Sequence, residues 1–167
     1  MNSNNKNPLK AIVEQTTNNA TSWIGRHNNN DIVGGQTFLS PSDSVLEAIE
    51  VFTSVVTVPG QVSMSVHTFD SQLQSWGPAL NTASVDFNSS DNGKWKTFTI
   101  PGLALSKGKT YGFRMESANC FVGVGETVAT YKTPLLIDGQ EWKFTNQDKT
   151  GQSFSYFSLA FKVEVRA

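Results

Sequence analysis

From Gly35 to the C-terminus, apolar and polar residues alternate in short runs that are separated by turn residues. In one such run, Val62, Met64 and Val66 alternate with Ser63 and Ser65. A period of two places the apolar side chains on one face of a β-strand, whereas a helix repeats about every 3.6 residues. The alternation therefore predicts strands with one buried face over most of the chain.

About ten such runs can be recognised, separated by turn signals such as Pro59-Gly60. Strands in this number and spacing are typical of antiparallel sandwiches and jelly rolls. The expected fold class is all-β, an antiparallel β-sandwich of the jelly-roll type with about nine or ten strands, and 167 residues suit one such domain. The expected strands cover residues 36–38, 46–56, 62–69, 83–87, 95–100, 111–117, 121–125, 135–137, 142–144 and 158–166. The side chains expected to face inward include Val62, Met64, Val66, Phe98, Ile100, Tyr111, Phe113, Met115, Leu159, Phe161, Val163 and Val165.

The first 33 residues differ from the rest because they are rich in asparagine. We expect an N-terminal arm over residues 1–33 and the sandwich over residues 34–167. Asn7 as N-cap and Pro8 at the first helical position are compatible with a short helix over residues 8–13. A helix this short needs a surface to pack on. The arm is expected to seal one end of the sandwich, to add an edge strand or to cross to a neighbouring subunit, with Trp23 and Ile24 as its anchor.

Charge and hydropathy exclude several classes of partner. The chain has 13 basic and 14 acidic residues and no basic block, so nucleic acid is not expected to bind. No apolar run approaches the roughly 20 residues that span a bilayer. The N-terminus lacks the apolar stretch of a secretory signal, so the expected location is cytoplasmic, or extracellular if a leader has been removed. Cys120 is the only cysteine and is expected to lie in the core.

The sequence gives little support to catalysis, metal binding or a cofactor. No paired-cysteine, His-x-His or HExxH spacing is present. Residues 88–93 resemble the start of an EF-hand loop, but Thr99 stands where a bidentate glutamate is required, so a turn is the preferred interpretation. The sequence does not exclude a calcium site made of backbone carbonyls. His67 is expected to point outward beside Arg114 and Glu116, as a polar site or as a solvated face.

Several segments follow an order found in a known group of domains. Gly35-Gln36-Thr37-Phe38, residues 46–51, Lys94-Trp95-Lys96-Thr97-Phe98 and residues 105–111 (LSKGKTY) come one after another. In this order the chain resembles the jelly-roll accessory domains of bacterial surface and secreted proteins, including carbohydrate-binding modules. The resemblance covers about residues 35–167, rests on fold-forming positions, and implies architecture rather than a ligand.

The tryptophans are the best indication of a ligand site. Trp76, Trp95 and Trp142 fall near turns or at strand starts, and indole rings stack on the C–H-rich faces of sugars while polar neighbours bind the hydroxyl groups. Alternatively, each indole caps the core and bonds its N–H to a loop carbonyl. The candidate ligand-binding residues are Trp76 with Asp70 and Gln74, Trp142 with Gln140 and Tyr131, and Trp95.

Two functions are compatible with these observations. The first is a non-catalytic binding module that uses loop tryptophans, with carbohydrate as the possible ligand. The second is a structural or assembly protein whose N-terminal arm and sheet edges form contacts in a homo-oligomer, because open sheet edges favour pairing. An enzyme is not expected.

Overall fold

The computed structural model describes residues 7–130 and 138–166. Within them it contains thirteen antiparallel strands, one 3₁₀ turn at Ser89–Asp91 and no α-helix, so the expected all-β sandwich is confirmed. The expected strand at residues 135–137 lies outside the described residues. The strands are β1 (Leu9–Gln15), β2 (Ala20–His27), β3 (Asn30–Leu39), β4 (Ser44–Val58), β5 (Gly60–Asp70), β6 (Ser75–Phe87), β7 (Lys94–Leu105), β8 (Thr110–Glu116), β9 (Phe121–Val128), β10 (Glu141–Thr145), β11 (Gln152–Phe154), β12 (Phe157–Leu159) and β13 (Phe161–Arg166).

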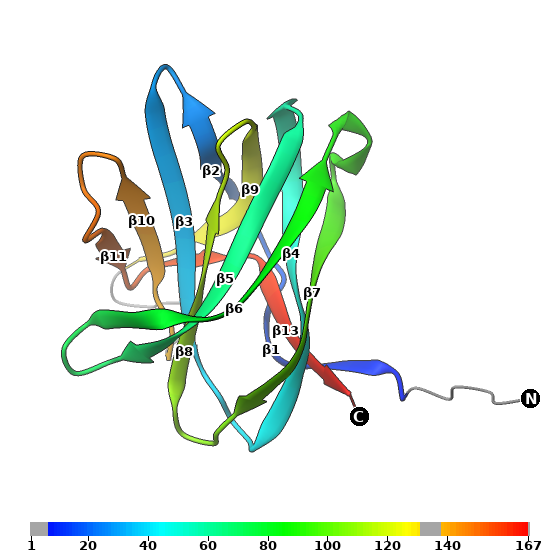
Figure 1. Ribbon diagram of the computed structural model, residues 1–167, viewed down its shortest axis with the longest axis vertical. Helices are drawn as coiled ribbons and strands as arrows, with labels where there is room; N and C mark the ends of the chain where they lie inside the picture. Colours follow the sequence, from blue (N-terminus) through cyan, green and yellow to red (C-terminus); the bar gives the residue numbers. More distant parts are fainter. Residues whose placement is uncertain (1–6, 131–137, 167) are drawn as a thin grey trace, which may run out of the picture.

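One hydrogen-bonded path, in the order β1-β13-β4-β9-β2-β3-β8-β5-β6, runs through most of the sheet. The path folds back on itself, so that β6, β5, β8 and β3 form one layer and β7, β4, β13 and β1 form the other (Figure 1). β10 adds to the first layer by pairing with β3, and β7 adds to the second by pairing with β4. The described residues include no helix that is long and apolar enough to cross a membrane.

The main core lies between the two layers and is built as the alternation predicts. All twelve inward positions named from the sequence are buried, including Met64 on β5, Phe113 on β8 and Phe161 on β13, which are fully buried. Neighbouring positions of the same strands, such as Ser65 and Arg114, are only partly buried because they face outward. Cys120 is also buried, and burial raises the pKa of its thiol.

The short helix expected at residues 8–13 is wrong, because Leu9–Gln15 is a strand that pairs with β13. A ladder on β13 satisfies the backbone of the segment and lets Ile12 and Val13 pack against the core, which so short a helix could not do alone. Of the three roles expected for the segment, the structure shows the added edge strand.

β2 is paired on both sides, with β9 and with β3. Its Ile24 is fully buried and anchors it, whereas Trp23 keeps 37% of its surface exposed and stacks on Phe121. The strands before residue 33 thus pair with strands after it, while the division into arm and sandwich at that residue stays a prediction.

A second, smaller apolar cluster lies on the outer side of the first layer. Trp142 and Phe144 of β10 pack there against Phe69 and Trp76, which face each other across the hairpin of β5 and β6. Figure 1 shows this hairpin end on the side of the molecule where β10 and β11 lie. The cluster closes one end of the outer face and so positions the site described next.

A glycine in the middle of a strand makes room for Trp76. A Cβ on Gly112 of β8 would lie 2.6 Å from the Cη2 and Cζ3 atoms of the Trp76 ring. Glycine inside a strand often marks such a close approach. Here the approaching group is the six-membered ring of the Trp76 indole.

Candidate functional site

The outer face of β8 carries a row of polar side chains that continues onto its neighbours. Residues opposite each other in an antiparallel pair share a face. In the register of β5 and β8, Ser65 lies opposite Arg114 and Ser63 lies opposite Glu116. On the other side of β8, Gly35 of β3 lies opposite Arg114. The alternation that buries Phe113 therefore gathers serine, arginine and glutamate on one outer surface.

Four neighbouring depressions follow this surface and share lining residues, and we treat them together as one groove. Glu116 lines three of them, and Arg114 lines three. We call this feature the β8 groove. It is defined by its lining residues Asp31, Val33, Ser63, Ser65, His67, Trp76, Arg114, Glu116, Phe144 and Lys149.

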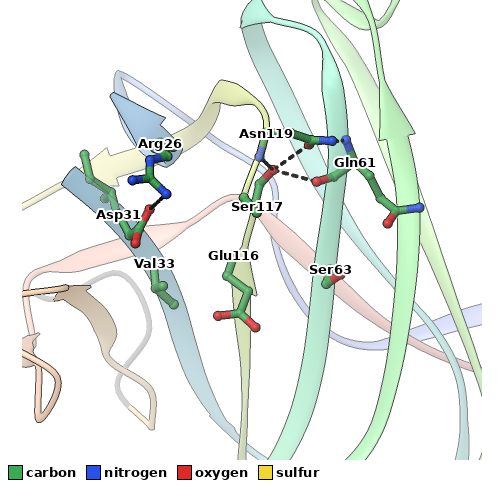
Figure 2. Close-up of a pocket in the computed structure, with 10 residues that line it drawn as sticks. Arg26, Asp31, Val33, Gln61, Ser63, Glu116, Ser117 and Asn119 are labelled. Atoms are coloured by element: carbon green, nitrogen blue, oxygen red, sulfur yellow. Dashed lines mark hydrogen bonds and ion pairs between the residues drawn. The ribbon is translucent and has the colours of Figure 1, made fainter. Parts of the chain in front are cut away.

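At the end of the groove away from the tryptophans, a depression of about 420 Å³ lies between β3, β8 and β5. Figure 2 shows Val33, Glu116 and Ser63 on these three strands. On one side of them, Arg26 Nη1 lies 3.9 Å from Asp31 Oδ1 in an exposed ion pair. This end of the groove offers carboxylates, a hydroxyl group and a paired cation.

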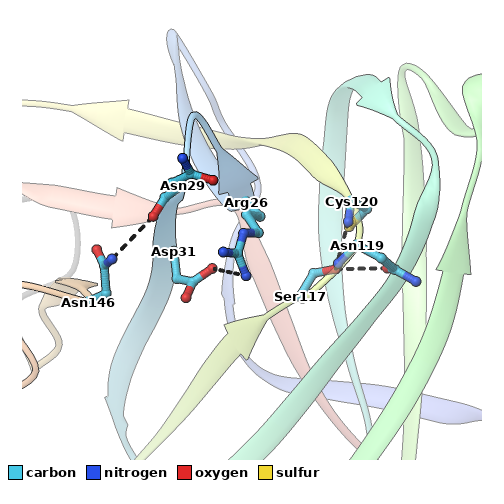
Figure 3. A network of polar contacts seen from close by, with 7 residues as sticks. All are labelled: Arg26, Asn29, Asp31, Ser117, Asn119, Cys120 and Asn146. Atoms are coloured by element: carbon cyan, nitrogen blue, oxygen red, sulfur yellow. Dashed lines mark hydrogen bonds and ion pairs between the residues drawn. The ribbon is translucent and has the colours of Figure 1, made fainter.

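The rim of this end is fixed by loop contacts (Figure 3). Ser117 Oγ donates to the Gln61 carbonyl at 2.6 Å and accepts from the backbone N–H groups of Asn119 and Cys120. Across the groove, Asn146 Nδ2 donates to the Asn29 carbonyl at 3.3 Å. These bonds tie the β8–β9 connection to β5 and the loop after β10 to the β2–β3 hairpin.

In the middle of the groove, a depression of about 300 Å³ brings together His67, Arg114 and Glu116, the three residues that the sequence suggested as neighbours. His67 Nδ1 lies 2.9 Å from the Gly77 carbonyl, which can only accept, so Nδ1 carries the hydrogen. Nε2 then accepts from Ser65 Oγ at 2.7 Å. Burial is the main cause that lowers the pKa of His67, and Arg114 lowers it further. His67 is therefore neutral at pH 7.

A serine that donates to a histidine is also the first part of a hydrolytic site. The third group here is a carbonyl, which carries no charge to stabilise the imidazolium that a catalytic base becomes. Arg114 disfavours that imidazolium as well. The arrangement is better suited to holding the Ser65 hydroxyl in a fixed orientation than to proton transfer.

At its other end the groove is bounded by the aromatic cluster. A depression of about 440 Å³ is lined there by Trp76, Trp142 and Phe144 together with Arg114 and Lys149. Arg114 Cζ lies 3.9 Å from the centroid of the Phe144 ring and 5.7 Å from that of Trp76. Stacking of this kind holds a guanidinium in one place and is favourable in itself.

Of the candidate residues around Trp76, two line this end of the groove. Trp76 is partly buried, and Gln74 lines the same depression. Asp70 instead caps the hairpin turn, where its Oδ1 accepts from the N–H groups of Gln72 and Leu73 at 3.0 and 2.9 Å. The structure therefore brings Trp76 and Gln74 together at the groove and gives Asp70 a contact within the turn.

The candidates around Trp142 are more dispersed. Trp142 is only 5% exposed and packs edge to face on Trp76. Gln140 lines a separate depression of about 280 Å³ that also includes Gln74 and Phe69. Tyr131 lies outside the described residues. Trp142 thus supports the wall of the groove from within the cluster.

Trp95 lies in the opposite layer, on the outer face of β7. Lys162 Nζ is 4.3 Å from the centroid of a Trp95 ring, and Phe52 meets the indole edge to face at 5.6 Å. Nearby, Glu50 Oε1 accepts from Thr97 Oγ1 at 3.1 Å. Trp95 therefore does not share a surface with Trp76 and Trp142.

A pair of buried acids lies on the inner side of β10. Glu141, which has no exposed surface, pairs with Gln36 of β3. Burial, reinforced by Glu126, raises the pKa of Glu141 to about 9. Lys143 Nζ lies 3.6 Å from Glu126 Oε2. Glu141 is thus protonated at neutral pH and belongs to the interior, not to the groove.

The sequence did not single out Phe69, Phe144 or Lys149 as site residues. The signal that could have found the aromatic cluster is Gly112, a glycine in the middle of an otherwise bulky strand, which indicates a close contact on that face. Lys149 lies in a loop without a pattern of its own. Only the fold shows that it stands beside Arg114.

No protein-family model and no curated protein sequence matches the chain. Solved structures that share its fold include two of the clostridial protein Cwp84. One contains the cysteine protease and lectin-like domains of Cwp84, a surface-layer associated protein of Clostridium difficile, with a TM-score of 0.52 and 11% identity over 83% of this chain and 32% of that chain. The other is the clostridial cysteine protease Cwp84 after propeptide cleavage, with a TM-score of 0.56 and 10% identity over 97% of this chain and 40% of that chain.

The part of Cwp84 that matches is the lectin-like domain and not the catalytic domain. The chain spans less than half the length of either structure that it matches. At this level of identity the similarity shows the fold alone. That fold agrees with the expected one, an antiparallel β-sandwich.

Proposed function

We propose that the protein is a non-catalytic binding module that holds a glycan in the β8 groove. The observation that carries the proposal is the arrangement of the groove, which places polar side chains of β3, β5 and β8 next to one aromatic wall. Sugars need both kinds of surface, because they present C–H faces and hydroxyl groups together. Its depressions of about 300 to 440 Å³ fall at the lower end of the range of ligand sites.

Three further observations support binding over catalysis. The hydroxyl of Ser65 is oriented by His67, and the guanidinium of Arg114 is held on Phe144, so the groove is preorganised. Of the two tryptophans at the groove, Trp76 and Trp142, only Trp76 is partly exposed, so it is the one that a ligand can contact. The structurally similar part of Cwp84 is called lectin-like, which agrees with a sugar ligand and with a location at the cell surface.

A bulky substitution in the groove tests this function. Ser63 lies on the floor of the groove, partly buried, so Ser63→Trp would fill the space between β8 and β6. We expect at least about a tenfold loss of affinity for any glycan that the protein binds on an array, or about 1.4 kcal/mol. Binding constants would be measured by isothermal titration calorimetry.

Thr99→Trp is the matched control, because Thr99 is exposed on β7 in the opposite layer. This variant should bind like the unchanged protein. If no glycan on the array binds, or if Ser63→Trp binds as well as Thr99→Trp, the proposed site is wrong.

A second candidate function is subunit assembly through β1. Among the described residues, β1 pairs only with β13, so its other edge is open, and Leu9 on it is 39% exposed. Open edges invite pairing with another copy. Light scattering of the full chain and of a chain that begins after Gln15 tests this function. A monomer in both cases contradicts it, whereas a dimer lost only on removal of β1 supports it.

A further inference from the structure

The aromatic end of the β8 groove has an unusual balance of charge. Its lining residues include two basic side chains, Arg114 and Lys149, and no carboxylate. The adjoining depression shares Arg114, Lys149 and Phe144 with it and adds the carboxylates of Asp31 and Glu116. The side of the two cations that faces Trp76 is therefore free of acids, and the carboxylates begin on their other side.

Arg114 has donors to spare. It is partly buried, and burial lowers the pKa of its guanidinium while the nearby charge of Glu116 raises it, so the group stays charged at neutral pH. Among the residues that the structure describes, its contacts are the two aromatic rings, with no ion pair within 4.0 Å and no hydrogen bond. Arg114 Cζ lies over the Phe144 ring, and the N–H groups of a guanidinium lie around the edge of its plane. A planar donor set held in this way suits a two-oxygen anion.

Lys149 adds a second positive charge to the same space. The neighbouring Asp148 does not line the depression, and its Oδ1 accepts from Thr150 Oγ1 at 3.2 Å and from Gly151 N–H at 3.1 Å. The turn that these bonds form brings Gly151 against Phe144, where a Cβ would lie 2.4 Å from the ring. The loop with Lys149 is thus held beside the aromatic wall.

From this arrangement we infer that the aromatic end of the β8 groove binds the anionic group of an acidic sugar, a carboxylate or a sulfate, with Arg114 as its principal partner. This inference rests on the proposed function, since it names the class of glycan. The sugar ring would lie against Trp76, and neutral sugars would extend toward Glu116. Because Glu116 and Asp31 repel further negative charge, a ligand charged on one sugar fits better than a uniform polyanion.

Matched ligands test the anionic group directly. The probes are lactose, 3′-sialyllactose with one carboxylate, and lactose 3′-sulfate, with tetragalacturonate and its methyl ester as a second backbone. We expect the charged member of at least one set to bind about tenfold or more tightly than its neutral partner. The two lactose derivatives distinguish a carboxylate from a sulfate. Affinities would be measured by calorimetry at low and at physiological salt, and the charged ligand should lose affinity as salt rises.

Variants of Arg114 test its role. Arg114→Gln should lower the affinity for the charged ligand at least about tenfold and remove the preference over the neutral one. Arg114→Lys keeps the charge without the planar donor set, so its affinity for the charged ligand should lie between those of the unchanged protein and of Arg114→Gln. Lys149→Gln should also lower the affinity for the charged ligand, by a smaller factor than Arg114→Gln. Lys107→Gln, an exposed lysine outside the groove, is the control for loss of one charge. Thermal melts would confirm that each variant is folded.

The outcomes separate the two proposals. If neutral and charged partners bind equally, or if Arg114→Gln keeps the preference, the inference about the anionic group is wrong while the glycan-binding function stands. Equal binding of heparin by the unchanged protein and by Arg114→Gln would also overturn the inference, because the attraction of anions to the protein would then not depend on Arg114. If no probe and no array glycan binds, the proposed function itself fails.

Discussion

The two outer faces of the sandwich each carry a basic side chain stacked on an aromatic ring. In the second layer, Lys162 Nζ lies 4.3 Å from a Trp95 ring centroid, and in the first, Arg114 Cζ lies 3.9 Å from the centroid of Phe144. Lys162 is surrounded by acids, since it pairs across the sheet with Glu14 and with Glu50. Arg114 lines one depression with Lys149 and no carboxylate, although Glu116 lies beside it in two others.

The surroundings of the two cations thus differ more than their stacking does. On the second layer, burial and Glu50 raise the pKa of Glu164 to about 7, and Lys162 counteracts the rise, so that face balances its charges internally. On the first layer, Arg114 and Lys149 line one depression that contains no carboxylate. An aromatic ring with a cation above it therefore does not define a binding site by itself. The charges that surround such a pair decide whether its cation is available to a ligand.

The largest expected effect concerns Glu141, on the inner side of the strand that carries the aromatic wall. The unfolded chain ionises this group near 4.5 and the folded protein near 9. Both states hold the proton below the lower value, and only the folded state holds it between the two, so stability falls by up to about 1.4 kcal/mol per pH unit as pH rises through this range. Glu141→Gln should remove most of this slope and stabilise the protein at about pH 8.

Denaturant unfolding at several pH values measures this slope. Glu47→Gln is the control, because Glu47 is partly exposed and paired with Arg166 at 3.8 Å, and it should keep the slope. A wild-type stability that does not change between about pH 5 and about pH 8 would show that burial does not govern Glu141.

Next in size is the effect of crowding the aromatic residues on the two faces. A Cβ on Gly112 would lie 2.6 Å from the Trp76 ring, whereas a Cβ on Gly125 would lie 3.1 Å from Phe52 Cδ1. Gly112→Ala should therefore cost about 1–3 kcal/mol of stability and weaken ligand binding by displacing the groove wall. Gly125→Ala should cost less and leave binding unchanged. Unfolding curves would measure the loss of stability, and calorimetry would measure the change in ligand affinity. Equal effects of the two substitutions would contradict the view that only the aromatic cluster around Trp76 shapes a binding site.

The smallest effect is on the protonation of His67. Its pKa lies below 6.5, mainly through burial, with Arg114 lowering it and Glu116 raising it. Since the folded pKa is below the unfolded one, protonation opposes folding, and this stability is lost as pH falls below the unfolded value. Arg114→Gln should raise the pKa of His67 by removing a positive neighbour, and Glu116→Gln should lower it. An NMR titration of the imidazole would measure both shifts, and shifts of the same sign would disprove the proposed surroundings.

The sequence predicted the interior better than the surface. Alternation along residues 62–66 and 111–115 identified the buried side chains correctly, because burial on one face of a strand is a local property with a period of two. For the same reason His67, Arg114 and Glu116 were expected to point outward, and the structure places them in one depression. For the asparagine-rich N-terminal segment, the sequence suggested a short helix where the structure has strand β1. That strand forms by pairing with β13 at the opposite end of the chain, which a local pattern does not reveal.

The tryptophans show where the sequence alone stops. Their positions near turns are similar, yet Trp142 is buried, Trp76 forms a groove wall and Trp95 lies on the opposite layer. Which of these places a tryptophan takes depends on contacts with strands far away in sequence, such as that between Trp76 and Gly112. The sequence by itself determined an all-β chain and its inward residues, because those follow from the repeat of each strand. The tertiary structure alone decided that Arg114 and Lys149 line one depression that contains no carboxylate, because their charges meet only when β8 and the loop after β10 come together.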